Sequence, residues 1–304
     1  MKKFWSCKKG SDMAREKKAG IYNQIISDIF RRNRKLGATR FDFSRSDLLD
    51  AARRFGIAEL EGDEKTIAKN IGDIVYTYRF RKDFPSDIVQ EAPKGKMWII
   101  VGKGDAQYEF RLITQPSIRA DPSLAATRIH DATPEIVRRF ELGDEQAVLA
   151  RIRYNRLVDL FCKCVAYSLQ NHLRTKVEGI GQIEVDELYA GTSRSGEIFI
   201  IPVQVKRAKD RLGVSQLLQD LEYCRRKHPD MRARALGAQK MSYLQDGTTY
   251  ERIALFEFEC RDTDADVEIM KVAEKHFVLL PHREITSRDL LAARNRSEAD
   301  QLTD

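Results

Sequence analysis

The sequence predicts an α/β protein built from two units. Residues 19–80 are dominated by apolar side chains at helical spacing, and two β-hairpin patterns lie further along the chain. Charge also divides the chain: residues 1–116 hold 24 Lys and Arg against 16 Asp and Glu, a balance of +8, whereas the rest hold 29 against 30, a balance of −1. A basic excess confined to one unit favours an N-terminal module that meets a polyanion.

The N-terminal unit, residues 1–116, reads as helices followed by a hairpin. Apolar side chains at helical spacing predict a first helix over residues 19–36. Ser44 begins a capping pattern before a short helix that stops at Gly56. A third helix is expected from Glu64 to Phe80, and its buried stripe is expected to consist of Ile67, Ile71, Ile74, Val75 and Tyr78. Strands 97–101 and 107–113 flank a Gly-rich turn.

Three helices and a hairpin is the order of a winged-helix-like DNA-recognition domain. In such a domain the third helix enters the major groove and the hairpin touches the DNA backbone. The basic residues expected to contact DNA from this unit are Lys69, Arg79, Arg81, Lys94, Lys96, Lys103 and Arg111. A structural or dimerising module remains the alternative, because this order also occurs in unrelated small domains.

Residues 117–142 contain two prolines and little periodicity, and are expected to form a linker with one short helix. The second unit, residues 143–294, is expected to begin with a long helix that ends near Arg174. The next elements expected are strands 183–191 and 198–206 around a turn at 192–196, a helix over 213–223, strands 231–238 and 250–260, and a closing helix over 267–277. Residues 295–304 are polar and expected to be disordered.

The hairpin of residues 183–206 carries the candidate chemistry. Residues two apart in a strand share a face, so Gln204 and Lys206 point the same way while Val203 and Val205 point into the core. A lysine that ends an apolar strand opposite an acid is costly unless it has a function. We therefore expect Asp186, Gln204 and Lys206 to converge near the open end of the hairpin.

This pattern resembles the PD-(D/E)XK nuclease superfamily, in which an acid on one strand and an acid-x-lysine on the next hold a divalent metal against the scissile phosphate. Asp186 matches the first acid, 18 positions before Gln204, and Lys206 matches the lysine. Gln204 stands where the commonest form has a carboxylate, and is similar to the Gln-x-Lys variant of Mrr-like restriction nucleases. The resemblance covers residues 143–281 and implies a restriction-endonuclease-like mixed sheet flanked by helices.

The resemblance implies Mg²⁺ as cofactor, with Mn²⁺ as a substitute. Such cations prefer oxygen ligands, which the side chains of Asp186 and Gln204 and the backbone carbonyl of Val205 supply. Lys206 would orient the attacking water or stabilise negative charge at phosphorus. Because Gln204 replaces one carboxylate, a further acid is expected to bind the metal, and the candidates are Glu187, Glu145 and Asp159. Arg207 and Lys209, which follow the lysine, are expected to contact DNA.

The expected function is a metal-dependent DNA endonuclease of restriction type, catalytic through Asp186, Gln204, Lys206 and Glu187. A homodimer is expected, because cutting double-stranded DNA requires two strands to be cleaved. Two alternatives stay open. The first is a DNA-binding regulator with a silent nuclease fold, which Gln204 favours, and the second is a structure-specific repair nuclease.

Composition excludes other classes of protein. No apolar run approaches the roughly 20 residues that span a bilayer, and the basic start lacks the apolar stretch of a secretory signal. The five cysteines are scattered and form no CxxC pair, so a disulfide framework or zinc site is not expected. The sequence therefore predicts a cytoplasmic protein that does not engage membranes.

Overall fold

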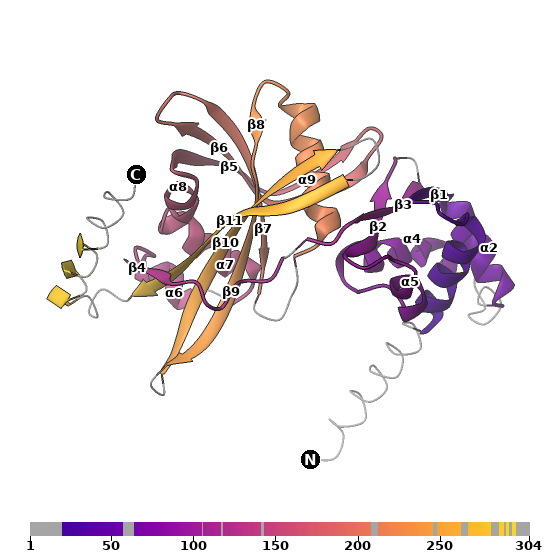
Figure 1. Ribbon diagram of the computed structural model, residues 1–304, viewed down its shortest axis with the longest axis horizontal. Helices are drawn as coiled ribbons and strands as arrows, with labels where there is room; N and C mark the ends of the chain where they lie inside the picture. The colour runs from indigo at the N-terminus through magenta and orange to yellow at the C-terminus, as the bar shows by residue number, and fades with distance from the viewer. Residues whose placement is uncertain are drawn as a thin grey trace, which may run out of the picture.

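A computed structural model of the chain describes residues 20–56, 64–104, 106–116, 118–140, 143–207, 212–245, 248–262 and 267–280, with 286–288, 290–291 and 294–295. It is a mixed α/β protein with a small sheet in its N-terminal part and a large, curled sheet after it (Figure 1). The predicted α/β class is confirmed. The predicted tail at 295–304 lies, after its first residue, outside the described part.

The N-terminal part contains the expected helices. They are a helix at 20–33, α2 (Arg45–Arg54), α4 (Glu64–Phe80) and the short α5 (Ser86–Gln90), which the sequence did not predict. The predicted cap is confirmed: the Ser44 hydroxyl accepts a hydrogen bond from the Asp47 amide at 3.3 Å, and the Asp47 carboxylate accepts one from the Ser44 amide at 2.7 Å. This reciprocal pair satisfies amides that the first helical turn leaves unpaired.

The predicted hairpin forms part of a three-stranded antiparallel sheet. Its strands are β2 (Lys96–Gly102) and β3 (Gln107–Thr114), and β1 (Arg40–Ser44) pairs with the other side of β3. β1 was not predicted. Aromatic rings join this sheet to the helices: Phe30 packs edge-on against Trp98 and Phe110 at 5.2 Å between ring centroids. Four of the five positions predicted for the buried stripe of α4 are buried, and the side chain of the fifth, Ile67, lies outside the described residues.

The large sheet has the strand order β4-β11-β10-β9-β7-β6-β5, with the short β8 beside β7. Its strands are β4 (Ala126–His130), β5 (Cys164–Val177), β6 (Gly181–Ser193), β7 (Ile198–Lys206), β8 (Arg232–Ala233), β9 (Ala235–Gln245), β10 (Thr248–Asp262) and β11 (Val267–Leu280). The predicted hairpin is confirmed as β6 and β7, which pair antiparallel. Pro202 cannot donate a backbone hydrogen bond, and it falls where β7 changes partner from β8 to β9.

Helices cover both faces of this sheet. α9 (Val214–Lys227), predicted at 213–223, connects β7 to the parallel strand β9 and packs on one face. α7 (Glu145–Tyr154) and α8 (Leu157–Cys162) pack on the other face, where Leu149 and Ile152 join the buried cluster of Val203 and Val205 (Figure 1). The chain thus runs from helix through three antiparallel strands to a helix and a parallel strand.

The long helix predicted from Gly143 to Arg174 is wrong beyond residue 162. The chain forms α7 and α8, breaks at Arg156 and Lys163, which adopt left-handed φ angles of 51° and 53°, and continues as β5. The apolar side chains expected to continue the helix, Val165, Leu169 and Leu173, are four residues apart. That spacing fits one face of a helix and equally one face of a strand, so periodicity could not distinguish them.

The closing helix predicted at 267–277 is also wrong, because these residues form β11 and pair along most of β10. β11 pairs on its other side with β4, in parallel. β4 lies inside the stretch that was predicted as a linker, residues 117–142, so this stretch contributes a strand to the large sheet as well as the short helix α6 (Glu135–Phe140). Pairing with a neighbour strand outweighs the weak local preference of such segments.

The two parts of the chain share a hydrophobic cluster. Ile99 of β2 and Ile113 of β3 are buried together with Leu217 of α9 and Phe256 of β10. The tip of the β2–β3 hairpin also meets the turn between β5 and β6, where a Cβ atom on Gly102 would lie 2.3 Å from the carbonyl oxygen of Ile180. The N-terminal sheet is therefore docked beside the large sheet (Figure 1). Only glycine fits at the point of contact.

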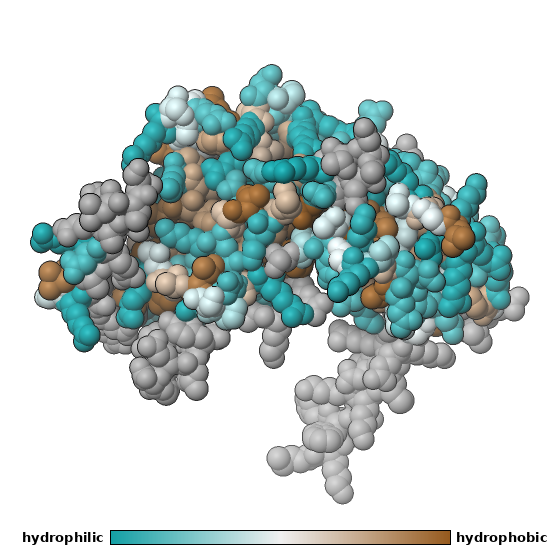
Figure 2. Space-filling model, in the orientation of Figure 1, coloured by the Kyte–Doolittle hydropathy of each residue, from teal (hydrophilic) through white to brown (hydrophobic). Residues whose placement is uncertain are grey.

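The surface is mainly hydrophilic on the face seen in Figure 2, where hydrophobic side chains show as separate patches. Across the residues that the structure describes, none of the helices combines the length and apolar character required to cross a membrane.

Candidate functional site

The candidate site lies where β6 and β7 separate. Their ladder pairs Thr192 with Ile198 at the turn end and stops at Glu187 and Val203. Beyond that point side chains connect the strands. The Asp186 carboxylate accepts a hydrogen bond from the Val205 amide at 2.8 Å, and the Gln204 amide nitrogen donates to the Glu184 carbonyl at 3.1 Å. The separated strands thus leave two polar side chains between them.

Gln204 is fully buried and is held by a residue that the sequence reasoning missed. Its Nε2 also donates to the carboxylate of Asp220 on α9, at 2.8 Å. Asp220 lies between Leu217 and Cys224 on the buried stripe of α9, three and four residues away. An acid within an apolar helical stripe is costly without a partner, and that position was the signal that could have identified it.

Lys206 reaches the first turn of α7. Its Nζ lies 3.4 Å from the Glu145 carboxylate, and the lysine side chain is 14% exposed against 38% for the acid. Asp186 is also nearly buried, at 8% exposed. The structure therefore brings together Asp186, Gln204, Lys206 and Glu145, as the sequence predicted for the first three and proposed for the fourth.

Burial dominates the electrostatics of the two aspartates. Desolvation raises the pKa of Asp186, although the Val205 amide and the Lys206 charge act in the opposite direction. Desolvation raises the pKa of Asp220 well above its ordinary value, and the negative charge of Asp186 raises it further. Each of the two carboxyl groups disfavours ionisation of the other, so a positive charge bound nearby would stabilise their ionised forms.

Asp220 is expected to make stability depend on pH. Its pKa is raised in the folded state, so the folded chain holds a proton that the unfolded chain releases once the pH exceeds about 4. The free energy of unfolding should therefore fall as pH rises from about 4 toward the raised pKa. Asp220→Asn keeps an acceptor for Gln204 and should raise the melting temperature at pH 7 and flatten this decline. Melting curves in EDTA from pH 4 to 8 test this, and an unchanged pH profile in the variant would contradict it.

The donor set fits a hard divalent cation with few protein ligands. Nε2 of Gln204 faces two acceptors, so Oε1 is the other end of the amide. This buried oxygen has no hydrogen-bond partner among the described residues. Asp186 supplies a carboxylate beside it, and Val205 a backbone carbonyl. Within the described residues, no three His, Cys, Asp or Glu side chains cluster closely enough to bind a metal ion. A cation would therefore rely on the amide oxygen and on water, as Mg²⁺ sites often do.

Glu187 and Asp159 lie in a different group, which argues against the roles expected for them. Glu187 is fully buried and accepts hydrogen bonds from Arg153 of α7 at 2.9 Å and from Ser168 of β5 at 2.6 Å. Asp159 pairs with Arg156 and accepts the amide of Ala166. Adjacent residues of a strand face opposite sides of the sheet, so Glu187 turns away from the side that Asp186 faces.

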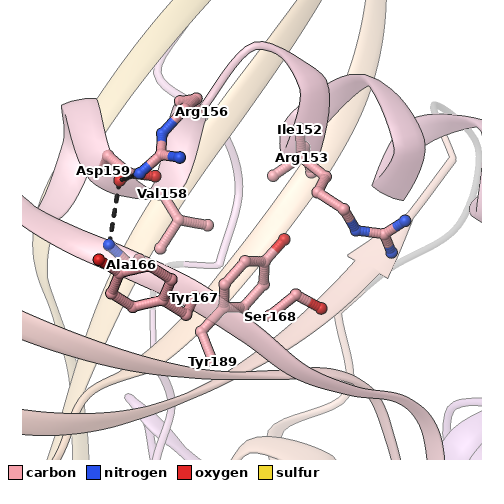
Figure 3. A pocket seen from close by; sticks show the side chains of 9 residues that line it. All are labelled: Ile152, Arg153, Arg156, Val158, Asp159, Ala166, Tyr167, Ser168 and Tyr189. Atoms are coloured by element: carbon pink, nitrogen blue, oxygen red, sulfur yellow. Dashed lines mark hydrogen bonds and ion pairs between the residues drawn. The ribbon is translucent and has the colours of Figure 1, made fainter.

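Arg153 and Asp159 line a small pocket between α7, α8 and the β5–β6 pair (Figure 3). The hydroxyl of Tyr189 points into this space beside the Arg153–Glu187 pair, and burial raises its pKa. Each arginine of the pocket is paired with an acid, Arg153 with Glu187 and Arg156 with Asp159. These pairs balance one another, so the pocket carries no excess charge that would attract a cation or a phosphate.

Three of the nine basic residues expected to contact DNA form ion pairs within the chain. Lys103 pairs with Asp42 at 2.9 Å, Arg111 with Glu109 at 2.6 Å, and Arg81 lies 3.9 Å from Asp73. Lys94 and Arg207 are exposed, and Lys96 is half-buried. Arg79 lies in a cleft between the two parts of the chain. The side chain of Lys69 and the whole of Lys209 are outside the described residues.

No protein-family model matches the chain, and no curated protein or solved structure is significantly similar to it.

Proposed function

We propose that the chain is a metal-dependent DNA endonuclease of restriction type that uses Asp186, Gln204 and Lys206. The observation that carries this proposal is the convergence of these three side chains, with Glu145, where β6 and β7 separate. A structural salt bridge accounts for Lys206 and Glu145 alone. It does not account for a buried amide oxygen without a partner beside a buried carboxylate.

The order of elements supports the proposal. A helix, three antiparallel strands, a helix and a strand parallel to the third is the core arrangement expected of a restriction-endonuclease-like domain, with Asp186 on its second strand and Gln204 and Lys206 on its third. The N-terminal part has the order helix, strand, helix, helix, strand, strand, apart from the extra α5, which agrees with a winged-helix-like module.

Each side chain has a role that its surroundings permit. Asp186 is fixed by the Val205 amide, and Gln204 is fixed by Asp220, so both oxygens are held in place before a ligand arrives. Mg²⁺ or Mn²⁺, held by Asp186, Gln204 and the Val205 carbonyl, would lower the pKa of a water and offset phosphate charge. Lys206 stays within reach of the same group and would stabilise negative charge that develops on the phosphate during cleavage. Glu145 orients Lys206 through their ion pair.

The direct test is incubation of the purified chain with methylated and unmethylated plasmid DNA, with Mg²⁺ or with EDTA. Mg²⁺-dependent double-strand cuts that give discrete fragments are expected. Smearing or nicking confined to branched substrates would instead favour the structure-specific repair nuclease. Measurement of the molecular mass in solution, with and without duplex DNA, tests the proposed homodimer.

Gln204 provides a test of the metal site itself. An amide attracts a cation less strongly than a carboxylate does, so half-maximal activity should require Mg²⁺ in the range of roughly millimolar. Gln204→Glu should lower that requirement, whereas Gln204→Leu should remove activity. The measurement is the Mg²⁺ dependence of the cleavage rate for the three proteins. Equal dependence in all three would place Gln204 outside the metal site.

One observation favours the DNA-binding regulator with a silent nuclease fold. The described residues offer no three-acid group for a metal, and Asp220, a buried acid in contact with Gln204, is occupied by that amide. If this reading holds, the chain binds duplex DNA with the same affinity in Mg²⁺ and in EDTA and leaves the DNA intact.

A further inference from the structure

A cleft of about 620 Å³ separates α4 and the β2–β3 hairpin from β5, β6 and α9. One wall comes from the N-terminal module and includes Arg79 and Tyr108. The other comes from the large sheet and includes Arg174, Lys176 and Glu184. The charged side chains of its lining are therefore three basic and one acidic, and Arg174 pairs with Glu184 at 2.8 Å.

Arg79 is the unusual residue of this cleft. Its guanidinium donates one hydrogen bond, to the side-chain oxygen of Gln219 at 2.9 Å, and lies over the ring of Phe80. Among the described residues, its buried Nε has no hydrogen-bond partner, and no carboxylate forms an ion pair with the guanidinium. Desolvation lowers the pKa of Arg79 to about 10. A desolvated cation without a counter-ion is costly, so the protein maintains this charge at the expense of stability.

We propose that Arg79 and the cleft around it form a binding site for a phosphate group of a nucleic acid strand. A guanidinium with free N–H groups matches the oxygens of a phosphate, and its low hydration suits a partly buried site. This inference rests on the proposed function, and it adds the place where the nucleic acid strand is bound.

The cleft and the candidate site share strand β6. Glu184, which lines the cleft, accepts the Gln204 amide through its backbone carbonyl. Gln219, which holds Arg79, donates to the carbonyl of Gln182 on the same strand. Strand β6 thus connects the proposed phosphate site at Arg79 with Asp186, which lies four residues beyond Gln182. Arg79 belongs to the N-terminal module, so that module would position the strand as well as select the sequence.

The test compares Arg79→Met with wild type for binding of a labelled duplex in EDTA, across a series of salt concentrations. Loss of one phosphate contact should reduce the slope of log affinity against log salt by about 0.9 and weaken binding about tenfold or more. Arg79→Gln should behave the same way, and Arg79→Lys should keep the slope. Arg31→Met is the matched control, because Arg31 is 70% exposed and is not part of the cleft.

Two results separate this inference from the proposed function. The first is that wild type cuts DNA while the neutral Arg79 variants bind duplex with the same affinity and salt slope as Arg31→Met. In that case the proposed phosphate site at Arg79 is wrong and the proposed nuclease function is retained. If wild type neither binds nor cuts duplex, the nuclease proposal fails, and inorganic phosphate decides the anion site. Phosphate should then raise the melting temperature of wild type more than that of Arg79→Met or Arg79→Gln at equal ionic strength. Equal shifts overturn the site.

Discussion

Asp186→Asn and Lys206→Met are each expected to lower the rate of DNA cleavage by about 10²–10³-fold or more, the usual effect of losing a key electrostatic stabiliser. Asparagine still accepts a hydrogen bond from the Val205 amide, so this variant removes charge and keeps the contact between the strands. Methionine preserves the length of Lys206, and the half-exposed Glu145 that loses its partner can be solvated at little cost. Duplex affinity in EDTA should change only a few-fold.

The cleavage rate with Mg²⁺ and the melting temperature are measured together, so that a folding defect is not mistaken for lost catalysis. Glu197→Gln serves as the control, because Glu197 is a half-exposed acid that directly precedes β7, at the end opposite Lys206. It should cleave like wild type. If folded Asp186→Asn or Lys206→Met retains nuclease activity, the strand ends are not the catalytic centre.

The local parts of this site could be predicted from sequence, because they depend on one hairpin. Alternation along β7 places Gln204 and Lys206 on one face, and the turn at 192–196 fixes which strands pair. The contribution of Glu145 was only one of several possibilities. It depends on where α7 starts, and the cap of that helix, Asp144, was not recognised.

The parts that could not be predicted depend on tertiary contacts. Asp220 becomes a partner of Gln204 only after α9 has packed on the sheet. β5 and β11 resemble helices in composition, and they become strands because β6 and β10 offer them open edges. The cleft at Arg79 joins residues 140 positions apart, Arg79 and Gln219, and no local pattern reports such a contact.

Because the two parts are docked, removing one of them is a poor way to separate DNA recognition from DNA cleavage. A boundary near residue 116 separates the basic charge from the metal motif in sequence. In the structure, Ile99 and Ile113 before that boundary are buried against Leu217 and Phe256 after it. Removing residues 1–116 would uncover this apolar cluster. Point variants such as those of Arg79 are therefore the sharper means of separating recognition from cleavage.

Phe256→Ala tests whether the N-terminal part and the large sheet unfold together, because Phe256 lies on β10 of the large sheet. Phe256 is fully buried in the shared cluster, and Phe→Ala changes in cores typically cost about 3–5 kcal/mol. The chain has two tryptophans, so a Trp5→Phe background leaves Trp98, in the core of the N-terminal module, as the sole reporter. Chemical unfolding is then followed by Trp98 fluorescence and by far-ultraviolet circular dichroism.

If the shared cluster makes the two parts one cooperative unit, both signals should shift to lower denaturant by the same amount and remain coincident. Phe256→Leu, which removes fewer atoms, should lie between wild type and Phe256→Ala. A Trp98 transition that stays in place while circular dichroism shifts would show that the N-terminal module unfolds alone. The position of Arg79 relative to Asp186 would then not be fixed by packing, and the strand-positioning role inferred for the cleft would lose its physical basis.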